Sequence, residues 1–276
     1  MSADGLTYRE FGPPPGLEGI VECFWRRECW RPPNHDLGVL PDGRMDLIWD
    51  TDGDMLVMGP QTQPLGRPLP PDAVVVGVRF PPGVGPALLG VPAYQLTNMH
   101  VALESVDAKL AVSLLRDLVT IEDAAAAPAR IARAVVRRFD EHGSLDLAVR
   151  RAAALLKNPG ARVHRIADTL ALSERQLQRR FRRAVGYGPK TLQRVLRFQR
   201  LLETLALDRA EADGLAGIAA AVGYSDQAHL TREARELSGL SPVRLADNLD
   251  TLRAGGASGI FKTGRPARSS VYPARS

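Results

Sequence analysis

The pattern of hydrophobic and polar residues divides the chain into a β-type first part and a helical remainder. Short apolar runs lie at residues 20–25, 45–49, 55–58 and 74–80, with prolines and glycines between them. Such runs are typical of strands bounded by turns. From residue 106 onward apolar residues recur every three or four positions, which predicts amphipathic helices. The sequence therefore predicts an α+β protein in which a mostly β N-terminal domain precedes an all-α C-terminal domain.

Two segments of the helical part repeat each other. Each consists of a short apolar helix, a tight turn and a longer amphipathic helix. In the first copy Ser173 stands at the N-cap position of the longer helix and Gly186 at its end, while Gly239 ends the second copy. Pro189 and Pro242 follow these glycines, where a fixed φ favours the start of another helix. This order of elements is that of a helix-turn-helix, and its duplication predicts a protein that contacts DNA twice.

The outward face of each longer helix carries side chains suited to DNA. Arginine and glutamine can read guanine and adenine edges in a major groove. In the first copy the exposed positions are Arg175, Gln178, Arg179, Arg182 and Arg183. The matched positions of the second copy are Gln227, Ala228, Thr231, Arg232 and Arg235, with Glu233 and Glu236 diluting the charge. We therefore expect the first helix to dominate affinity. A solvated, arginine-rich helix on an unrelated bundle is the alternative for either helix alone, and the duplication argues against it.

The two segments IADTLALSERQLQRRFRRAVGYGP and IAAAVGYSDQAHLTREARELSGLSP resemble the DNA-binding domain of the AraC/XylS family of bacterial transcription regulators. The resemblance covers about residues 160–249 and implies that a long helix over 189–206 joins two helix-turn-helix subdomains. It implies base contacts from Arg175, Gln178, Arg179, Gln227, Ala228, Thr231 and Arg232. The residues expected at the DNA backbone are Arg182, Arg183, Arg194, Arg197 and Arg235.

Two residues depart from the family pattern. Ala171 stands where the first turn usually has glycine, which costs up to about 1 kcal/mol if that residue needs a positive φ. Ala234 replaces the usual aromatic core residue of the second unit, so we expect looser packing there. Neither departure removes a side chain that faces DNA.

The first hundred residues carry a second resemblance, in the phrases LPDGRMDLIWD, MGPQTQPL and VVGVRFPPGVGPALLGVP. These are similar to the N-terminal domain found ahead of some AraC-type DNA-binding domains, over about residues 6–105. Pockets for small molecules are mainly hydrophobic with a few polar anchors. The candidate pocket residues are Trp25, Trp49, Arg79 and Phe80, with Arg79 as the polar anchor. Plain core packing is the alternative role of the three aromatic residues.

Charge and composition also indicate that the two halves of the chain have different functions. Residues 144–276 contain 23 Lys and Arg against 12 Asp and Glu, whereas residues 1–143 contain 13 against 19. The basic half is therefore expected to bind nucleic acid. No catalytic or phosphate-binding motif, metal site or cofactor site is recognised, and no apolar run is long enough to span a membrane, so we expect a cytoplasmic non-enzyme. Cys23 and Cys29 are expected to be thiols, with redox or metal sensing as the alternative.

These observations give a domain plan and a functional hypothesis. We expect a β-rich sensor domain over 1–105, a helical connector and candidate dimer interface over 106–158, the double helix-turn-helix over 159–250, and a disordered basic tail over 251–276. The chain would be a sequence-specific transcription regulator controlled by a small molecule or by oligomerisation through its N-terminal domain. Its expected partners are double-stranded DNA, RNA polymerase, an unidentified effector and a second copy of itself. An enzyme or ligand-binding protein whose helical domain docks a partner, and a non-specific architectural DNA binder, are the alternatives. Activation and repression are left open.

Overall fold

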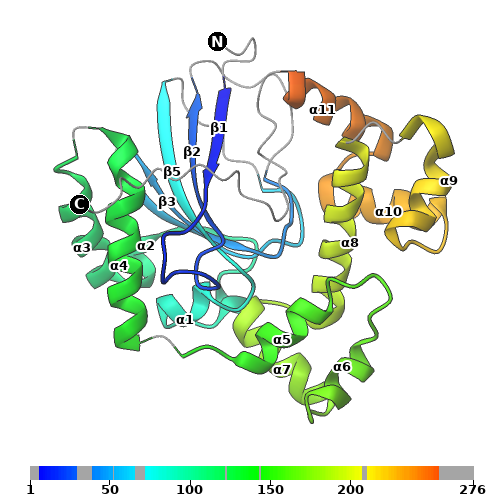
Figure 1. Ribbon diagram of the computed structural model, residues 1–276, viewed down its shortest axis with the longest axis horizontal. Helices are drawn as coiled ribbons and strands as arrows, with labels where there is room; N and C mark the ends of the chain where they lie inside the picture. The colour runs from blue at the N-terminus through cyan, green and yellow to red at the C-terminus, as the bar shows by residue number, and fades with distance from the viewer. Residues whose placement is uncertain are drawn as a thin grey trace.

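A six-stranded antiparallel sheet forms the first part of the computed structural model (Figure 1). The structure describes residues 6–29, 39–51, 53–65, 72–121, 123–142, 144–206 and 210–254. In spatial order the strands are β1 (Leu6–Phe11), β2 (Cys23–Cys29), β5 (Ala73–Phe80), β3 (Met45–Asp50), β4 (Met55–Met58) and β6 (His100–Ala102). The four predicted strands correspond to β2 to β5. The sheet also contains β1 and β6 at its edges, which the apolar pattern missed because β1 includes charged Arg9 and Glu10 and β6 is only three residues long.

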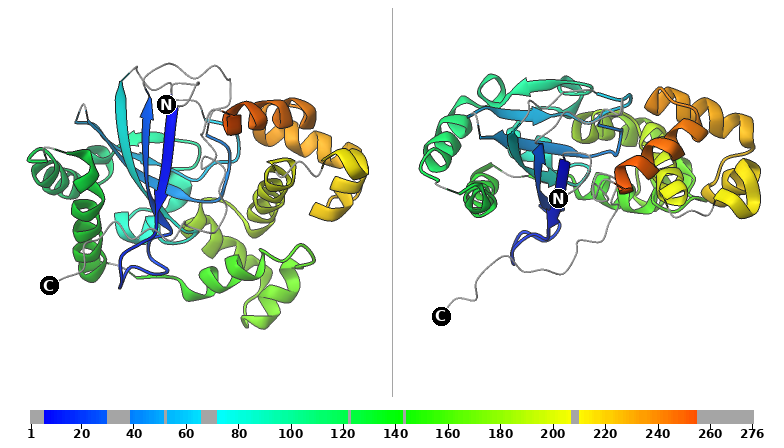
Figure 2. Two further views of the ribbon diagram at one scale, coloured as in Figure 1. Left: turned by 45° about the horizontal axis from the view of Figure 1, so that its top comes forward. Right: turned by 90° about the horizontal axis from the view of Figure 1, so that it is seen from above.

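The two faces of the sheet bury different kinds of side chain, as alternation along a strand requires. One face carries Phe24, Leu47, Val78 and other apolar residues, and it packs against helices in the largest hydrophobic core. The helices of the N-terminal part are α1 (Gly85–Leu89), α2 (Leu103–Val106), α3 (Ala108–Leu118) and α4 (Ala127–His142), with single 3-10 turns at η1 (Ala93–Gln95) and η2 (Ala124–Ala126). Figures 1 and 2 show α3 and α4 on one side of the sheet and α8 to α11 on the other.

The structure divides the predicted connector between two cores. Leu114 of α3 and Ile131 of α4 are fully buried in the core that they share with the sheet. The last helix of that segment, α5 (Leu147–Leu155), instead contributes Val149 and Ala152 to the core of the first helix-turn-helix. The apolar faces of α3 and α4 are thus used within the N-terminal fold, so these helices extend it beyond the boundary expected at residue 105.

The C-terminal part is all-helical, as predicted. It contains α6 (Val163–Thr169), α7 (Glu174–Val185), α8 (Pro189–Ala206), α9 (Ala210–Val222), α10 (Gln227–Ser238) and α11 (Pro242–Ala254). One hydrophobic core joins α5, α6 and α7, and a second joins α9, α10 and α11. Leu192 of α8 belongs to the first core, whereas Val195 and Phe198 belong to the second. The helix α11 continues to Ala254, and residues 255–276 of the expected tail lie outside the described residues.

A network of buried charges lies on the other face of the sheet. The Arg79 guanidinium contacts Asp46 at 3.1 Å and Glu10 at 3.4 Å, and Arg44 forms two hydrogen bonds of 2.6 Å with Glu22. Burial raises the pKa of Asp46, and the nearby Arg79 opposes that shift. Burial likewise raises the pKa of Glu10. Burial also disfavours the charge on Glu22, but Arg44 outweighs it and holds the pKa of Glu22 below its ordinary value. Arg44 therefore favours the charged form of Glu22, whereas at Asp46 and Glu10 the effect of burial on the pKa exceeds the opposing effect of Arg79.

Replacing Arg79 by methionine is expected to lower the free energy of unfolding by about 3 to 5 kcal/mol, because the charge of Asp46 would stay buried without its partner. Denaturant unfolding followed by circular dichroism measures this loss. Exposed Arg9 on β1 offers a matched control, and Arg9→Ala is expected to change stability by less than about 0.5 kcal/mol. Equal and small losses in the two variants would contradict the structural role of the network.

Candidate nucleic-acid interface

The longer helix of the first unit, α7, has the boundaries that its sequence predicts. The Ser173 hydroxyl accepts a hydrogen bond from the backbone N–H of Gln176 at 3.2 Å, and the Gln176 side chain accepts one from the Ser173 N–H at 2.8 Å. This reciprocal pair satisfies two amides that the first turn would otherwise leave unpaired. The helix ends at Gly186 with φ of 96°, a conformation that favours glycine. The predicted N-cap and C-cap are both confirmed.

The turn before α7 contains backbone strain. Ala171 has φ of 52°, so it adopts the left-handed conformation that the family pattern assigns to glycine at this place. Its N–H donates a 3.0 Å hydrogen bond to the Asp168 carbonyl, which fixes it in the turn. A side chain with a Cβ is strained here, and the turn holds it because the helices on either side are packed in one core.

Ala171→Gly is expected to raise the free energy of unfolding by up to about 1 kcal/mol, because glycine adopts this φ without the Cβ penalty. Thermal unfolding of the two proteins measures the difference. In Ala154→Gly, the same substitution falls on an exposed residue near the C-terminal end of α5, where it should destabilise by up to about 1 kcal/mol. Destabilisation of similar size in both variants would show that the turn carries no strain.

The predicted DNA-facing residues of α7 are exposed, because the opposite side of the helix is core. Leu177, Phe181 and Val185 are buried, and the outward positions are Arg175, Gln178, Arg179, Arg182 and Arg183. No carboxylate in the described part of the chain forms an ion pair with Arg175, Arg179 or Arg183. Gln178 differs, because its amide lies so close to Gly188 that a Cβ there would approach it to 2.3 Å. The unpaired arginines are thus available to an anionic partner.

The neighbouring Arg180 was not predicted to have a role. Its Nε lies 2.8 Å from Asp146, which also caps the N-terminus of α5. The pair thus connects α7 to α5 and holds the recognition helix on its own subdomain. No local pattern indicates this contact, because the two residues come from different helices.

The second longer helix, α10, presents a weaker positive face. Its exposed predicted residues are Gln227, Ala228, Arg232 and Arg235, whereas Thr231 is half-buried. The Thr231 hydroxyl donates to the Gln227 carbonyl at 2.9 Å, so it is used within the helix. Asp226 caps the helix by accepting from the His229 N–H at 2.7 Å, and this hydrogen bond lowers the pKa of Asp226. Ala234 is fully buried in the second core, to which it adds only a methyl group.

Two arginines that are expected at DNA phosphates form ion pairs with carboxylates of α10. Arg194 lies 3.2 Å from Glu233 and also pairs with Glu236, while Arg197 lies 2.6 Å from Glu233. Only 3% of the Glu233 side chain is exposed, and His229 contacts the same carboxylate at 3.1 Å. Buried Glu233 requires these partners, because an unpaired charge in a core is strongly unfavourable. The structure therefore places Arg194 and Arg197 in the contact that fixes α10 on α8.

The N-terminal domain also contacts α7. The guanidinium carbon of Arg182 lies 5.7 Å from the centroid of the Tyr94 ring in η1, within cation–π range. The Thr97 hydroxyl donates to the Gly186 carbonyl at 3.3 Å. A Cβ at Gly186 would approach Thr97 Oγ1 to 2.5 Å, so glycine is required here by packing as well as by its positive φ. One expected phosphate contact, Arg182, is thereby engaged by the N-terminal domain.

A second contact of the N-terminal domain reaches α8. Leu40 is buried in the core of the second helix-turn-helix, and the next residue, Pro41, accepts a buried 2.6 Å hydrogen bond from Gln199 Nε2. A Cβ at Gly43 would approach Leu192 Cδ1 to 2.8 Å. The segment from Leu40 to Gly43 is thus where the β-rich domain packs against α8.

The four candidate pocket residues do not line one pocket. Trp25 belongs to the small cluster on one face of the sheet, and Arg79 lies on that face, bonded to carboxylates. Trp49 and Phe80 lie on the opposite face, in the core that packs against helices. Alternation along the strands separates the pairs, and the separation follows from the register of β2, β3 and β5. Burial also raises the pKa of the Cys23 thiol, which disfavours the reactive thiolate.

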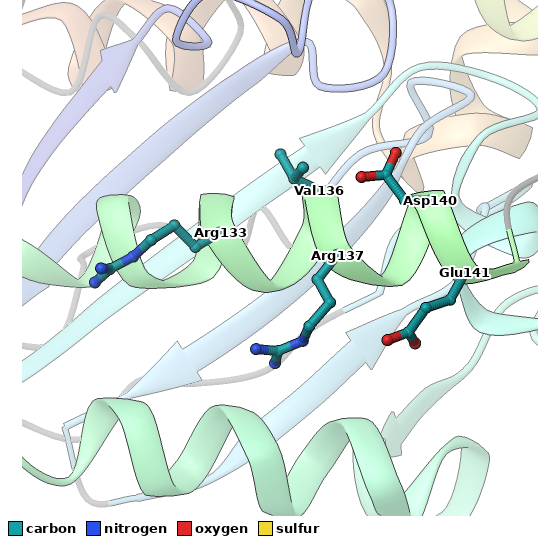
Figure 3. Close-up of a pocket in the computed structure, with 5 residues that line it drawn as sticks. All are labelled: Arg133, Val136, Arg137, Asp140 and Glu141. Atoms are coloured by element: carbon teal, nitrogen blue, oxygen red, sulfur yellow. The ribbon is translucent and has the colours of Figure 1, made fainter.

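A hollow of about 500 Å³ lies on the outer side of α4 (Figure 3). Its lining residues are Arg133, Val136, Arg137, Asp140 and Glu141. In Figure 3 these side chains diverge from the helix and do not converge on a common centre. No group of His, Cys, Asp or Glu in the described ranges has the arrangement of a metal site. Among the same residues, no helix is long and apolar enough to cross a membrane.

Comparison with protein families gives two matches. Residues 9–102 match a family described as a domain of unknown function (DUF6597), and residues 166–248 match a family described as a helix-turn-helix domain. The chain carries an AraC-type helix-turn-helix domain. The match begins within α6 and ends within α11, and this domain supports a role as a DNA-binding transcription regulator.

Among solved structures, the chain is similar to ToxT from Vibrio cholerae O395. One ToxT structure is 12% identical with a TM-score of 0.42, and the match covers 88% of this chain and 97% of that one. Another, bound to (E)-4-(8-methylnaphthalen-1-yl)but-3-enoic acid, is 8% identical with a TM-score of 0.44, covering 88% and 98%. No curated protein matches the chain.

Proposed function

We propose that this protein regulates transcription by sequence-specific binding, with α7 and α10 of one chain in successive major-groove segments about one helical turn apart, roughly 34 Å. The observation that carries the proposal is the exposed, unpaired arginine face of α7 on a capped helix whose other side is core. Base reading would fall to Arg175, Gln178 and Arg179. On α10, Gln227, Ala228 and Arg232 are exposed, while the Thr231 hydroxyl, whose proton is donated to the Gln227 carbonyl, would contact a base as an acceptor or through its methyl group.

The phosphate contacts are proposed to come from side chains that keep their charge available. Arg183 and Arg235 are exposed, and neither forms an ion pair within the described residues. Arg194 and Arg197 are already paired with carboxylates, so their charge is partly neutralised before DNA arrives. Phosphate contacts position the protein without reading sequence. We therefore propose that the phosphate contacts orient the protein on DNA and that α7 discriminates between base sequences.

Control by the N-terminal domain is the second part of the proposal. That domain contacts α7 through Tyr94 and Thr97, and it contacts α8 through Leu40 and Pro41. A ligand or a second copy of the chain that displaced these contacts would change how the two recognition helices are held. Binding of RNA polymerase, homodimer formation and a cytoplasmic location stay predictions.

Arg179→Ala is expected to weaken binding to a selected duplex by about 1 to 3 kcal/mol and to relax the preference at one base pair, because arginine pairs with guanine through two hydrogen bonds. Selection from a random DNA pool followed by titration measures both effects. Arg183→Ala serves as the matched control and should weaken binding to all sequences equally. Unchanged affinity and preference in Arg179→Ala would contradict base reading by α7.

The same titration separates the two alternatives. An architectural binder would bind random and selected duplexes with equal affinity at physiological salt, because its contacts are all to the backbone. An enzyme whose helical domain docks a partner would bind neither duplex. The proposal requires tighter binding of the selected duplex by the wild-type chain.

Tyr94→Ala is expected to tighten DNA binding by about two- to fivefold, because the lost cation–π contact with Arg182 is worth about 0.5 to 1 kcal/mol. Binding to selected and random duplexes should increase alike, since Arg182 would then reach a phosphate. Phe in place of Tyr94 keeps the ring and serves as the control. A weaker or unchanged affinity in Tyr94→Ala would show that the contact does not compete with DNA.

A further inference from the structure

A second hollow, of about 510 Å³, lies where α6, α7 and α8 begin. Arg162 stands directly before α6, and His164 lies within that helix. Glu174 is the first residue of α7, and Lys190 and Arg194 belong to α8. Gln193 closes one wall by donating a 2.7 Å hydrogen bond to the Ala161 carbonyl. The hollow is thus formed by three helices, and the charged residues that line it are mainly basic.

The charge available in this hollow comes from Arg162 and Lys190. Both are exposed, and no ion pair joins either of them to a carboxylate of the described residues. Arg194 is already paired with Glu233 and Glu236, and Glu174 is the one acidic residue among those that line the hollow. Lys190 is the second residue of α8, where the helix dipole disfavours a positive charge. An anion in the hollow would remove that penalty for Lys190.

The hollow borders the start of α7, and it is connected to α10 through the ion pairs of Arg194. Its border includes Glu174, at the start of α7, and Arg194, which is bonded to α10 through Glu233 and Glu236. If α7 and α10 occupy successive segments of the major groove, the phosphates that separate those segments must cross the protein surface between the helices. The basic lining and the position of the hollow therefore both favour a phosphate of the DNA backbone as its ligand.

We propose that this hollow binds a DNA backbone phosphate between the two groove segments, with Arg162 and Lys190 as the contacting cations. The inference rests on the proposed function, and it adds two residues that the helical faces of α7 and α10 do not include. Because phosphate carries no sequence information, these contacts add to affinity and register and leave base preference unchanged. Glu174 opposes them, so its charge limits the affinity.

The test measures the salt dependence of binding to the selected duplex and to a random one. Loss of one phosphate contact lowers the slope of log affinity against log salt by about 0.9, so the affinity of Lys190→Ala should fall about threefold less than that of wild type between 50 and 200 mM salt. Arg162→Ala should behave alike, and Glu174→Gln should tighten binding to both duplexes. Arg116→Ala, which removes an exposed charge from α3, is the matched control and should keep the wild-type slope.

Ethylation interference gives an independent readout. Wild-type binding should be impaired when one phosphate between the half-sites is ethylated, and Lys190→Ala should be insensitive to ethylation at that same phosphate. An unchanged slope and unchanged interference in Lys190→Ala and Arg162→Ala, with selective binding intact, would overturn the phosphate site alone. Absence of selective binding in the wild-type chain would instead overturn the proposed function.

Discussion

The arrangement of both DNA-binding units depends on one shared helix, α8. Its apolar side chains belong to two cores, with Leu192 in the first and Val195 and Phe198 in the second. Closely packed cores transmit displacement, because side chains interdigitate without space to absorb it. The spacing of α7 and α10 is therefore set by the length and packing of α8, and the ion pairs of Glu233 add a polar fixation on the α10 side.

The N-terminal domain is connected to this helix by a short path. Arg44 is bonded to Glu22 in the buried charge network, and three residues before it Pro41 accepts the hydrogen bond from Gln199 of α8. Leu40 completes the path by entering the second core. A change in the position of Arg44 would thus displace α8 through a segment of five residues, 40–44. In the proposed regulation, a structural change in the N-terminal domain could therefore reach α8 directly, without passing through α3 to α5.

The sequence predicted those features that depend on near neighbours. The N-cap at Ser173 and the helix end at Gly186 follow from helix capping, which involves residues within about four positions. It failed where partners are distant in sequence. Trp25 and Trp49 were grouped as pocket residues, yet the strand register puts them on opposite faces of the sheet. For Arg197, which was expected near a phosphate, no local pattern indicates the carboxylate partner Glu233, 36 positions later in the chain.

The amino-acid sequence by itself determined the two helix-turn-helix units, their boundaries and the basic character of their outward faces, because periodicity, caps and charge are local properties. Only the tertiary structure decided which of the arginines are free. Arg175 and Arg179 form no ion pair among the described residues. Arg182, in contrast, lies over the Tyr94 ring, and Arg194 forms an ion pair with Glu233. The physical reason is that the availability of a charge depends on which side chains the fold brings close to it, and that distance cannot be read from positions far apart in the linear sequence.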